Sequence, residues 1–237
     1  MTQTRARARG SRPRREVGIP SPASEDYLAA IYALSDEGRT VIGARLAEHL
    51  GVAPPTVTET LRRLERDGLV RFGERHEVSL TDAGHALGEG VVRRHRLVER
   101  WLRDYLGLSA SEAHRVAHRF EHGFSGDLEE RLFLALGSPL TCPHGNPIPG
   151  SGARTSRNVY PLDRVEPGQT VVVDRITEGA EQDLDLLEQL ERAGVWPGTS
   201  LVVDTVGGGS MTLRRDDMQF TIPAAAAALI WVQPPQT

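Results

Sequence analysis

Hydrophobic residues between positions 24 and 66 recur every three or four places, in three runs separated by turn-forming residues. This spacing puts them on one face of a helix, so three short amphipathic helices are expected. Ser24 is expected to cap the first helix, Gly51 to end the second, and Pro54 to open the third. Gly68 is expected to end the third helix.

The next segment, LVRFGERHEVSLT, predicts two short strands joined by a turn around residues 73–75. Three short helices followed by a hairpin form the layout of a winged helix-turn-helix, a DNA-binding module. We expect this domain over residues 23–81.

Residues 1–22 hold six arginines and one glutamate, which predicts a disordered basic arm near a polyanionic partner. A merely solubilising tail is the alternative for this arm.

Helical spacing resumes after the hairpin, first from Thr81 to about Leu106, then over residues 109–122 and 126–136. We expect a helical domain over residues 82–140. Its large hydrophobic residues exceed what one small core needs, which predicts a helix-mediated homodimer. These residues are Val92, Leu97, Val98, Trp101, Leu102, Phe120, Phe133 and Leu134.

A stretch rich in proline, glycine and serine predicts a linker over residues 141–161. Beyond it, five short β-like runs separated by glycine-rich turns predict a small SH3-like barrel over residues 162–237. The alanines at 224–228 are expected to form a helical corner. The expected fold class is therefore mainly α with a small β domain.

The composition excludes several classes of protein. No run of 18 apolar residues occurs, so no membrane span is expected. The chain has one cysteine, Cys142, which is expected in a loop and rules out an intrachain disulfide or a cysteine-based zinc finger. A cytoplasmic protein is expected from these features.

The polar face of the third predicted helix suits DNA. Thr56 and Thr58 can hydrogen-bond phosphate oxygens, and Pro55 can pack on a thymine methyl group. Glu59 can accept a hydrogen bond from cytosine N4, and Arg63 can neutralise a phosphate. Further backbone contacts are expected from the second helix and the wing, at Arg45, Arg75 and His76.

Imidazoles and a carboxylate gather on one stripe of the predicted helix over residues 109–122, at His114, His118, Glu121 and His122. Unpaired polar groups resist burial, whereas a divalent cation takes imidazole and carboxylate as ordinary ligands. His95 and Glu99 repeat this pairing one turn apart on the preceding helix. A solvated polar face is the alternative for any single pair, but the whole constellation predicts a metal site.

Several motifs occur in the order found in the diphtheria toxin repressor family of iron- and manganese-dependent transcriptional regulators. The resemblance covers roughly residues 24–150 and consists of SEDYLAAIYAL, VAPPTVTETLRRLERDGLV, LTDAGHAL, RRHRLVERWL, HRFEH and GNPIPG. More weakly, RITEGAEQDLDLLEQLERAGVWPGTSLVV is similar to the SH3-like third domain of iron-dependent members.

The resemblance implies two metal sites. The primary site falls on Asp26, His118, Glu121 and His122, and the ancillary site on His95, Glu99, His114, Glu178 and Glu181. Iron-type members have methionine in place of Asp26, so this aspartate favours Mn²⁺. His118 stands where the family has cysteine or glutamate, and an added imidazole raises affinity for Fe²⁺ and Zn²⁺. Mn²⁺ or Fe²⁺ is the expected cofactor, with Zn²⁺ as a third candidate.

The function implied is a homodimeric, metal-activated repressor of metal-ion homeostasis genes that binds a palindromic operator in double-stranded DNA. A cation between Asp26 and the helical domain would fix two recognition helices about one DNA turn apart, ~34 Å. A winged-helix regulator that senses an organic ligand is the alternative. An enzyme is not expected, because no HExxH motif, nucleophile or glycine-rich phosphate loop adjoins the site.

Overall fold

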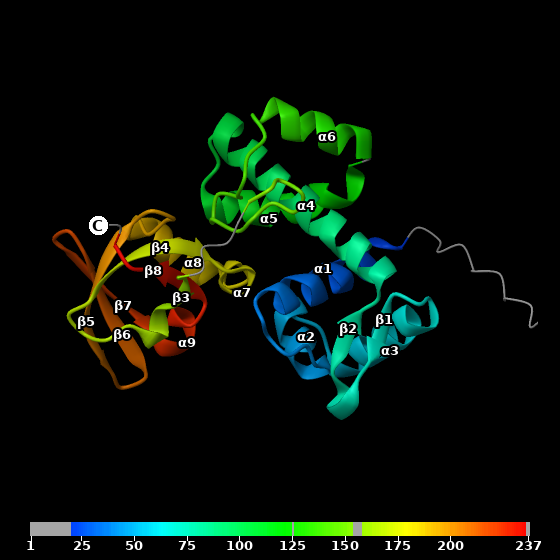
Figure 1. The fold of residues 1–237 in the computed structure, drawn as a ribbon, viewed down its shortest axis with the longest axis horizontal. Coiled ribbons are helices and arrows are strands. Elements are labelled where there is room, and N and C mark those ends of the chain that lie inside the picture. Colours follow the sequence, from blue (N-terminus) through cyan, green and yellow to red (C-terminus); the bar gives the residue numbers. More distant parts are fainter. Residues whose placement is uncertain (1–19, 125, 154–157, 236–237) are drawn as a thin grey trace, which may run out of the picture.

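The structure is a computed structural model that describes residues 20–124, 126–153 and 158–235. The chain forms three bodies in sequence order, coloured blue to cyan, green, and yellow to red in Figure 1. Helices dominate the first two, and a six-stranded sheet forms the third, so the expected fold class is confirmed. Almost all of the predicted basic arm lies outside the described residues.

The first body contains the three helices and the hairpin that the sequence predicts. Its elements are α1 (Pro22–Asp36), α2 (Gly43–Leu50), α3 (Pro54–Arg66), β1 (Val70–Phe72), the 3-10 turn η1 (Glu74–His76) and β2 (Val78–Leu80). The face of α3 formed by Val57, Leu61 and Leu64 is buried in the core. Gly51 ends α2 with a φ of 62°, which is the left-handed cap expected there. The opposite face of α3 therefore points away from the core.

Helix α1 begins about one turn earlier than the sequence pattern predicted. Ser21 rather than Ser24 is the N-cap, and its hydroxyl accepts a hydrogen bond from the Ser24 N–H. Pro22 occupies the first helical position, where a missing N–H costs nothing and the fixed φ suits a helix. Ser24 is consequently buried inside the helix, and its hydroxyl accepts a hydrogen bond from Arg63 at 3.1 Å.

The long helix α4 (Asp82–Leu106) leads from the first body into the second and is capped by Thr81, as predicted. Around its C-terminal half pack α5 (Ala110–Phe120), the 3-10 turn η2 (Glu121–Gly123) and α6 (Gly126–Ala135). The helix predicted over residues 109–122 is wrong at its end, because the chain tightens at Glu121. The carbonyl of Glu121 accepts a hydrogen bond from Arg94 at 2.7 Å instead of continuing the helix.

The third body is an antiparallel sheet with strand order β3-β8-β4-β5-β6-β7. Its elements are β3 (Tyr160–Pro161), the 3-10 turn η3 (Leu162–Arg164), β4 (Thr170–Ile176), α7 (Glu178–Glu181), α8 (Leu184–Arg192), β5 (Ser200–Gly207), β6 (Ser210–Arg215), β7 (Met218–Pro223), α9 (Ala224–Ala227) and β8 (Ile230–Gln233). The five predicted β-like runs and the alanine corner are all present. Alternate residues such as Val171 and Val173 point into the core of this body.

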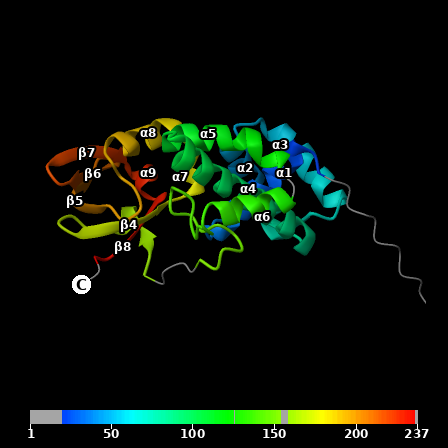
Figure 2. The ribbon, with the colours of Figure 1, turned by 90° about the horizontal axis from the view of Figure 1, so that it is seen from above.

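Polar contacts dock the third body onto the second. Glu191 of α8 accepts hydrogen bonds from the N–H of Ala110 and the hydroxyl of Ser111, at 3.1 and 3.2 Å. A carboxylate at this place also complements the dipole at the start of α5. Figure 2 shows the first and third bodies toward opposite ends of the molecule, and α7 contacts α1 between them.

Some of the predicted hydrophobic surplus lies at the surface of the second body. The exposed residues there are Tyr105, Leu106, Phe120, Leu128, Leu134 and Leu140. Val92, Leu97, Val98 and Leu102, which were counted in that surplus, are instead buried within the chain. Trp101 and Phe133 are partly buried, so Phe120 and Leu134 are the exposed members of the surplus that a second copy could contact. Among the described residues, no helix combines the length and apolarity needed to cross a membrane.

Glycines in α4 let it approach the first body closely. A Cβ atom on Gly88 would lie 2.6 Å from the carbonyl oxygen of Leu28, which is too close for any side chain. We predict that Gly88→Ala lowers the free energy of unfolding by about 1–3 kcal/mol, because α1 and α4 must move apart. Denaturant unfolding of the purified chain measures this change.

The matched control is Gly90→Ala on the same helix. Its Cβ would meet only the end of the Arg94 side chain, at 3.4 Å, which is the near limit of an ordinary van der Waals contact. This variant should keep the stability of the parent or gain about 0.5–1 kcal/mol, since alanine favours a helix over glycine. Equal stabilities for the two variants would show that the α1–α4 contact is not a tight one.

Candidate metal centre

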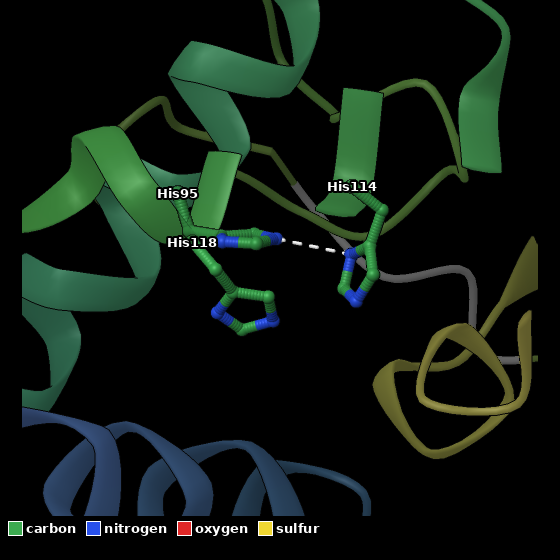
Figure 3. Close-up of side chains that lie close together, drawn as sticks. All are labelled: His95, His114 and His118. Carbon is green, nitrogen blue, oxygen red and sulfur yellow. Dashed lines mark hydrogen bonds between the residues drawn. The ribbon is translucent and has the colours of Figure 1, made fainter. Parts of the chain in front are cut away.

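Histidines from two helices gather where the three bodies meet. Figure 3 shows His95 of α4 beside His114 and His118 of α5, with their rings turned toward one another. Nε2 of His95 lies 3.1 Å from Nδ1 of His114, and ring centroids in this trio are 4.6 to 4.9 Å apart. Such close imidazoles repel one another if all are protonated, so they require carboxylates or a cation between them.

Asp26, Glu121 and His122 form one donor group, whose ligand atoms all lie within 4.8 Å of one another. Nε2 of His122 is 3.0 Å from Oδ1 of Asp26 and 3.5 Å from Oε1 of Glu121. Nδ1 of His118 is 3.3 Å from the same Glu121 oxygen, although its side chain is 45% exposed. Three of the four residues expected for the primary site therefore share one donor group, whereas His118 contacts Glu121 but is grouped with His95 and His114 of the ancillary site. They line a cavity of about 290 Å³.

Glu25 supports this group and was not selected from the sequence. Its Oε2 lies 2.6 Å from Nδ1 of His122, so the opposite ring nitrogen faces Asp26 and Glu121. Carboxylates that hold the second nitrogen of a ligand histidine fix its orientation and raise its basicity. The sequence concealed this role, because an acidic residue in the first turn of a helix is already explained by the helix dipole.

The five residues expected for the ancillary site also lie together, and all are buried. His95, His114, Glu178 and Glu181 form a donor group within 4.8 Å. Oε1 of Glu99 lies 3.1 Å from Nε2 of His95 and 2.9 Å from Nδ1 of His114. Because Glu178 and Glu181 belong to α7, this group connects the third body to the second.

A hydrogen bond between Glu121 and His95 links the two groups, and His118 also shares a donor group with His95 and His114. Oε2 of Glu121 lies 2.5 Å from Nδ1 of His95, while Oε1 of Glu121 faces His118 and His122. The other nitrogen of His95 faces Glu99 and His114. Any change in the protonation or position of His95 therefore reaches both groups.

Burial and pairing set opposite charges on these side chains. Burial lowers the pKa of His114, but hydrogen bonds to Glu181 and Glu99 outweigh it and raise the pKa to about 10. Burial also lowers the pKa of His95, yet its charge pairing with Glu99 and its contact with Glu121 raise that pKa well above its usual value. Burial raises the pKa of Glu121, whereas hydrogen bonds to His118 and His95 bring it to about 2. Without a cation, these groups pair as imidazolium and carboxylate.

The donor set fits a divalent transition-metal cation. Oε2 of Glu99 is buried and has no hydrogen-bond partner within the part of the chain that the structure describes. An unpaired buried carboxylate oxygen is costly, and a cation removes that cost. Imidazole with carboxylate suits Mn²⁺, Fe²⁺ and Zn²⁺, and neither donor group contains sulfur.

The residues expected to contact DNA lie on α3, α2 and the wing. Pro55, Thr56, Thr58, Glu59, Arg63, Arg75 and His76 are exposed, and Arg45 is partly buried. Three of them make contacts within the chain. The Thr58 hydroxyl donates to the Pro54 carbonyl at 3.1 Å, Arg63 donates to Ser24, and Arg45 donates to the Thr40 carbonyl. A contact between the Arg63 guanidinium and a DNA phosphate would compete with the hydrogen bond that Arg63 donates to Ser24 of α1.

Three family models match the chain in sequence order. Residues 21–78 match the iron dependent repressor N-terminal DNA binding domain, and residues 81–150 match the iron dependent repressor metal binding and dimerisation domain. Residues 160–234 match the FeoA domain.

Curated proteins and solved structures agree with these matches. The iron-dependent repressor IdeR of Mycobacterium tuberculosis is 43% identical over 201 residues, which cover 80% of this chain and 87% of the relative. The diphtheria toxin repressor of Corynebacterium diphtheriae is 36% identical over 206 residues, covering 83% and 91%. A structure described as a manganese-dependent transcriptional repressor in complex with manganese superposes with a TM-score of 0.77 at 31% identity, covering 90% of this chain and 100% of that one.

Proton competition follows from the raised histidine pKa values. A nitrogen with a raised pKa keeps its proton at neutral pH, so a cation must displace that proton and binds less tightly as the pH falls. We predict that the affinity for Mn²⁺ drops about tenfold per pH unit for each proton displaced, between about pH 8 and pH 6. Isothermal titration in buffers of different ionisation enthalpy counts the protons released. An affinity that stays flat across this range would contradict the imidazolium–carboxylate pairing.

Proposed function

The chain belongs to the diphtheria toxin repressor family of iron-dependent repressors, and from this premise we propose that Mn²⁺ or Fe²⁺ activates it for operator binding. It is a DNA-binding repressor, and the expectation that it is no enzyme is confirmed by this family. It acts as a homodimer on a palindromic operator, in the cytoplasm, where it controls genes of metal-ion homeostasis. One observation carries the proposal: Asp26 of α1 and Glu121 and His122 of η2 share one donor group.

The proposed activation works through the position of α1. A bound divalent cation supplies the positive charge that holds the carboxylates and imidazoles of this group together. Asp26 is thereby fixed relative to His122, whose ring Glu25 orients. Because Ser24 of the same helix accepts a hydrogen bond from Arg63 of α3, the position of α1 influences the recognition helix. Metal affinity and operator affinity then rise together, as reciprocal coupling requires.

The ancillary residues support this geometry from the other side. Glu178 and Glu181 bring α7 against His95 and His114, so the third body braces the helices that carry the primary donors. The contact of Glu121 with His95 connects the ancillary residues to the primary donor group. We assign the ancillary group a strengthening role, with the primary group as the switch.

The choice of metal rests on the donor atoms and on the relatives. The relative from Mycobacterium tuberculosis is named an iron-dependent repressor, whereas the structure just compared is described as manganese-dependent. Asp26 adds a hard oxygen that suits Mn²⁺, and His118 adds a nitrogen that suits Fe²⁺ and Zn²⁺. Mn²⁺ and Fe²⁺ are the proposed activators, and Zn²⁺ is the third candidate.

An organic effector fits the site less well. The cavity at the primary group measures about 290 Å³, which is at the lower limit of the roughly 300–1,000 Å³ typical of small-molecule pockets. Alanine, leucine and valine residues form part of its lining, but Asp26, Glu121 and His122 bring their ligand atoms within 4.8 Å of one another, as a cation requires. The geometry therefore favours a cation as the signal.

Removing a primary ligand tests the proposed switch. We predict that His122→Ala lowers Mn²⁺ affinity by about 100-fold or more, since even the loss of a ligand's supporting partner costs about 10- to 100-fold. The same variant should also lose metal-dependent binding of operator DNA, which a gel-shift titration measures. His85→Ala is the control, because His85 lies on α4 and is more than half exposed, away from both donor groups. Metal-dependent binding by His122→Ala equal to that of the control would place the switch elsewhere.

Two further substitutions test metal choice. Asp26→Met removes the hard oxygen and should shift the response away from Mn²⁺ toward Fe²⁺. His118→Glu replaces a nitrogen with an oxygen and should weaken Zn²⁺ more than Mn²⁺. Anaerobic isothermal titration of both variants against Mn²⁺, Fe²⁺ and Zn²⁺ gives the order of affinities. The same order in both variants and in the parent would show that these positions do not select the metal.

A further inference from the structure

A second cavity lies between the first and third bodies, and we call it the interdomain cavity. The C-terminal part of α1 and helix α2 line one side, and β3, η3, α7, α9 and β8 line the other. Its volume is about 780 Å³, compared with about 290 Å³ for the cavity at the primary group. The larger volume lies well within the roughly 300–1,000 Å³ typical of small-molecule pockets.

The wall that the third body contributes is largely apolar and includes two aromatic rings. Tyr160 and Trp231 come from β3 and β8, which are paired strands, and Leu229 lies just before β8. The guanidinium of Arg175 stacks on the Trp231 ring, 4.4 Å from its centroid, and so restrains the indole. Such a wall suits the apolar body of an organic ligand.

Two polar side chains of the cavity have no partner in the part of the chain that the structure describes. Thr177 is 1% exposed, and its buried hydroxyl makes no hydrogen bond there, although Thr177 is the N-cap of α7. Arg164 of η3 makes no ion pair or hydrogen bond within the same described residues. A buried hydroxyl without a partner is costly, so a ligand with a polar group that reaches it is favoured.

Three arginines and three carboxylates line the interdomain cavity, and half of them are already engaged. Nη1 of Arg39 lies 3.9 Å from Oε2 of Glu37. Burial and the nearby charge of Glu178 raise the pKa of Glu37 to about 7, so this carboxylate is only partly charged at neutral pH. Asp183 accepts a hydrogen bond from the N–H of Leu186 at 3.0 Å, as the N-cap of α8. Together these three groups contribute little net charge.

The other three charged groups leave an excess of positive charge in the cavity. Arg45 donates to the carbonyl of Thr40, and Arg164 has no partner among the described residues, so no carboxylate there neutralises either guanidinium. Glu48 of α2 is exposed, and solvent screens its charge. Guanidinium groups form strong hydrogen bonds with carboxylates and related anions. A ligand with one acidic group therefore fits this set.

We propose that the interdomain cavity binds an aromatic organic acid, whose ring packs against Tyr160 and Trp231 and whose anionic group pairs with Arg164. The Thr177 hydroxyl gains a polar partner in the same ligand. The cation remains the signal at the primary group, and the organic acid is a second effector at a separate place. Binding of the acid does not depend on activation by the metal.

The cavity adjoins the ancillary metal group through α7. Thr177 and Gly179 line the cavity and are the chain neighbours of Glu178, which belongs to the ancillary donor group. An acid in the cavity holds α7 against α1 and α2, and so favours the arrangement in which Glu178 faces His95 and His114. Linkage then requires that the acid and the metal raise each other's affinity by the same factor. This coupling, unlike binding of the acid, rests on the proposed role of the ancillary group.

An aromatic sulfonate, 8-anilinonaphthalene-1-sulfonate, tests the cavity, because its fluorescence rises when it leaves water. Titration of the full metal-free chain should saturate at one equivalent per chain. Arg164→Ala should weaken binding about tenfold or more, as the loss of a charge-assisted hydrogen bond predicts. Arg192→Ala is the matched control, because Arg192 belongs to the third body, has a side chain that is 73% exposed and does not line the cavity. This control should bind the probe like the parent.

A neutral probe tests the need for an acid without any substitution. N-phenyl-1-naphthylamine has the same ring systems and no sulfonate, so the parent protein should bind it more weakly. Equal affinity for both probes, or equal affinity of the parent and Arg164→Ala for the sulfonate, would overturn the proposed site.

Mn²⁺ separates this inference from the proposed switch. Saturating Mn²⁺ should raise the affinity of the parent for the sulfonate, and an unchanged affinity would overturn the coupling. His122→Ala should still bind the sulfonate while it loses metal-dependent operator binding. Loss of sulfonate binding in His122→Ala would show that the probe occupies the primary group, and would overturn the interdomain site without affecting the switch.

Discussion

The fold is organised around charges that it has buried. Glu99 has no exposed surface, yet imidazoles, another carboxylate and an arginine surround it, and its pKa lies well below the usual value. Burial opposes that charge, but His144 and His95 more than offset the effect. Removing one partner from such a network leaves an uncompensated buried charge, which typically costs about 3–5 kcal/mol. The relative positions of α4, α5 and α7 are therefore constrained by charge as much as by hydrophobic packing.

This constraint makes the three bodies depend on one another. The second body alone would hold His95, Glu99 and His114 without the carboxylate of Glu181 that pairs with His114. The first body alone would leave Asp26 without the facing His122. Each body has its own hydrophobic cluster, yet the polar residues at their junction meet these partners only when all three bodies are assembled. A cation adds positive charge where carboxylates converge, which explains how a small ion can influence so large an arrangement.

Local signals predicted most of the secondary structure, because glycine, proline and hydrophobic spacing act over a few residues. Gly51, Pro54 and Thr81 mark helix ends that the structure has. The start of α1 was misplaced because Ser21 and Ser24 are both suitable caps, and Pro22 at the first helical position and the contact of Ser24 with Arg63 distinguish them. The end of α5 was misplaced because Arg94, distant in sequence, binds the Glu121 carbonyl.

The candidate site was predictable only where its donors repeat along one helix. His114, His118 and Glu121 drew attention by spacing, and family resemblance supplied Asp26, Glu178 and Glu181. Glu25 and His144 carry no such signal, since each lies in a segment that has an ordinary local explanation. Their importance comes from contacts with residues far away in the sequence, His122 for Glu25 and Glu99 for His144. Pairing across such distances is decided by packing, which a single sequence does not reveal.

The close contact between α1 and α4 explains why the switch is placed where it is. Gly88 allows the two helices to approach until only backbone separates them, at Leu28. Asp26 lies half a turn before this contact, so the packing of Leu28 against Gly88 holds the backbone beside Asp26 close to α4. A looser contact would let α1 slide and would absorb the pull of a bound cation. Tight backbone packing at Gly88 therefore supplies a fixed point for the proposed coupling between the metal and the recognition helix.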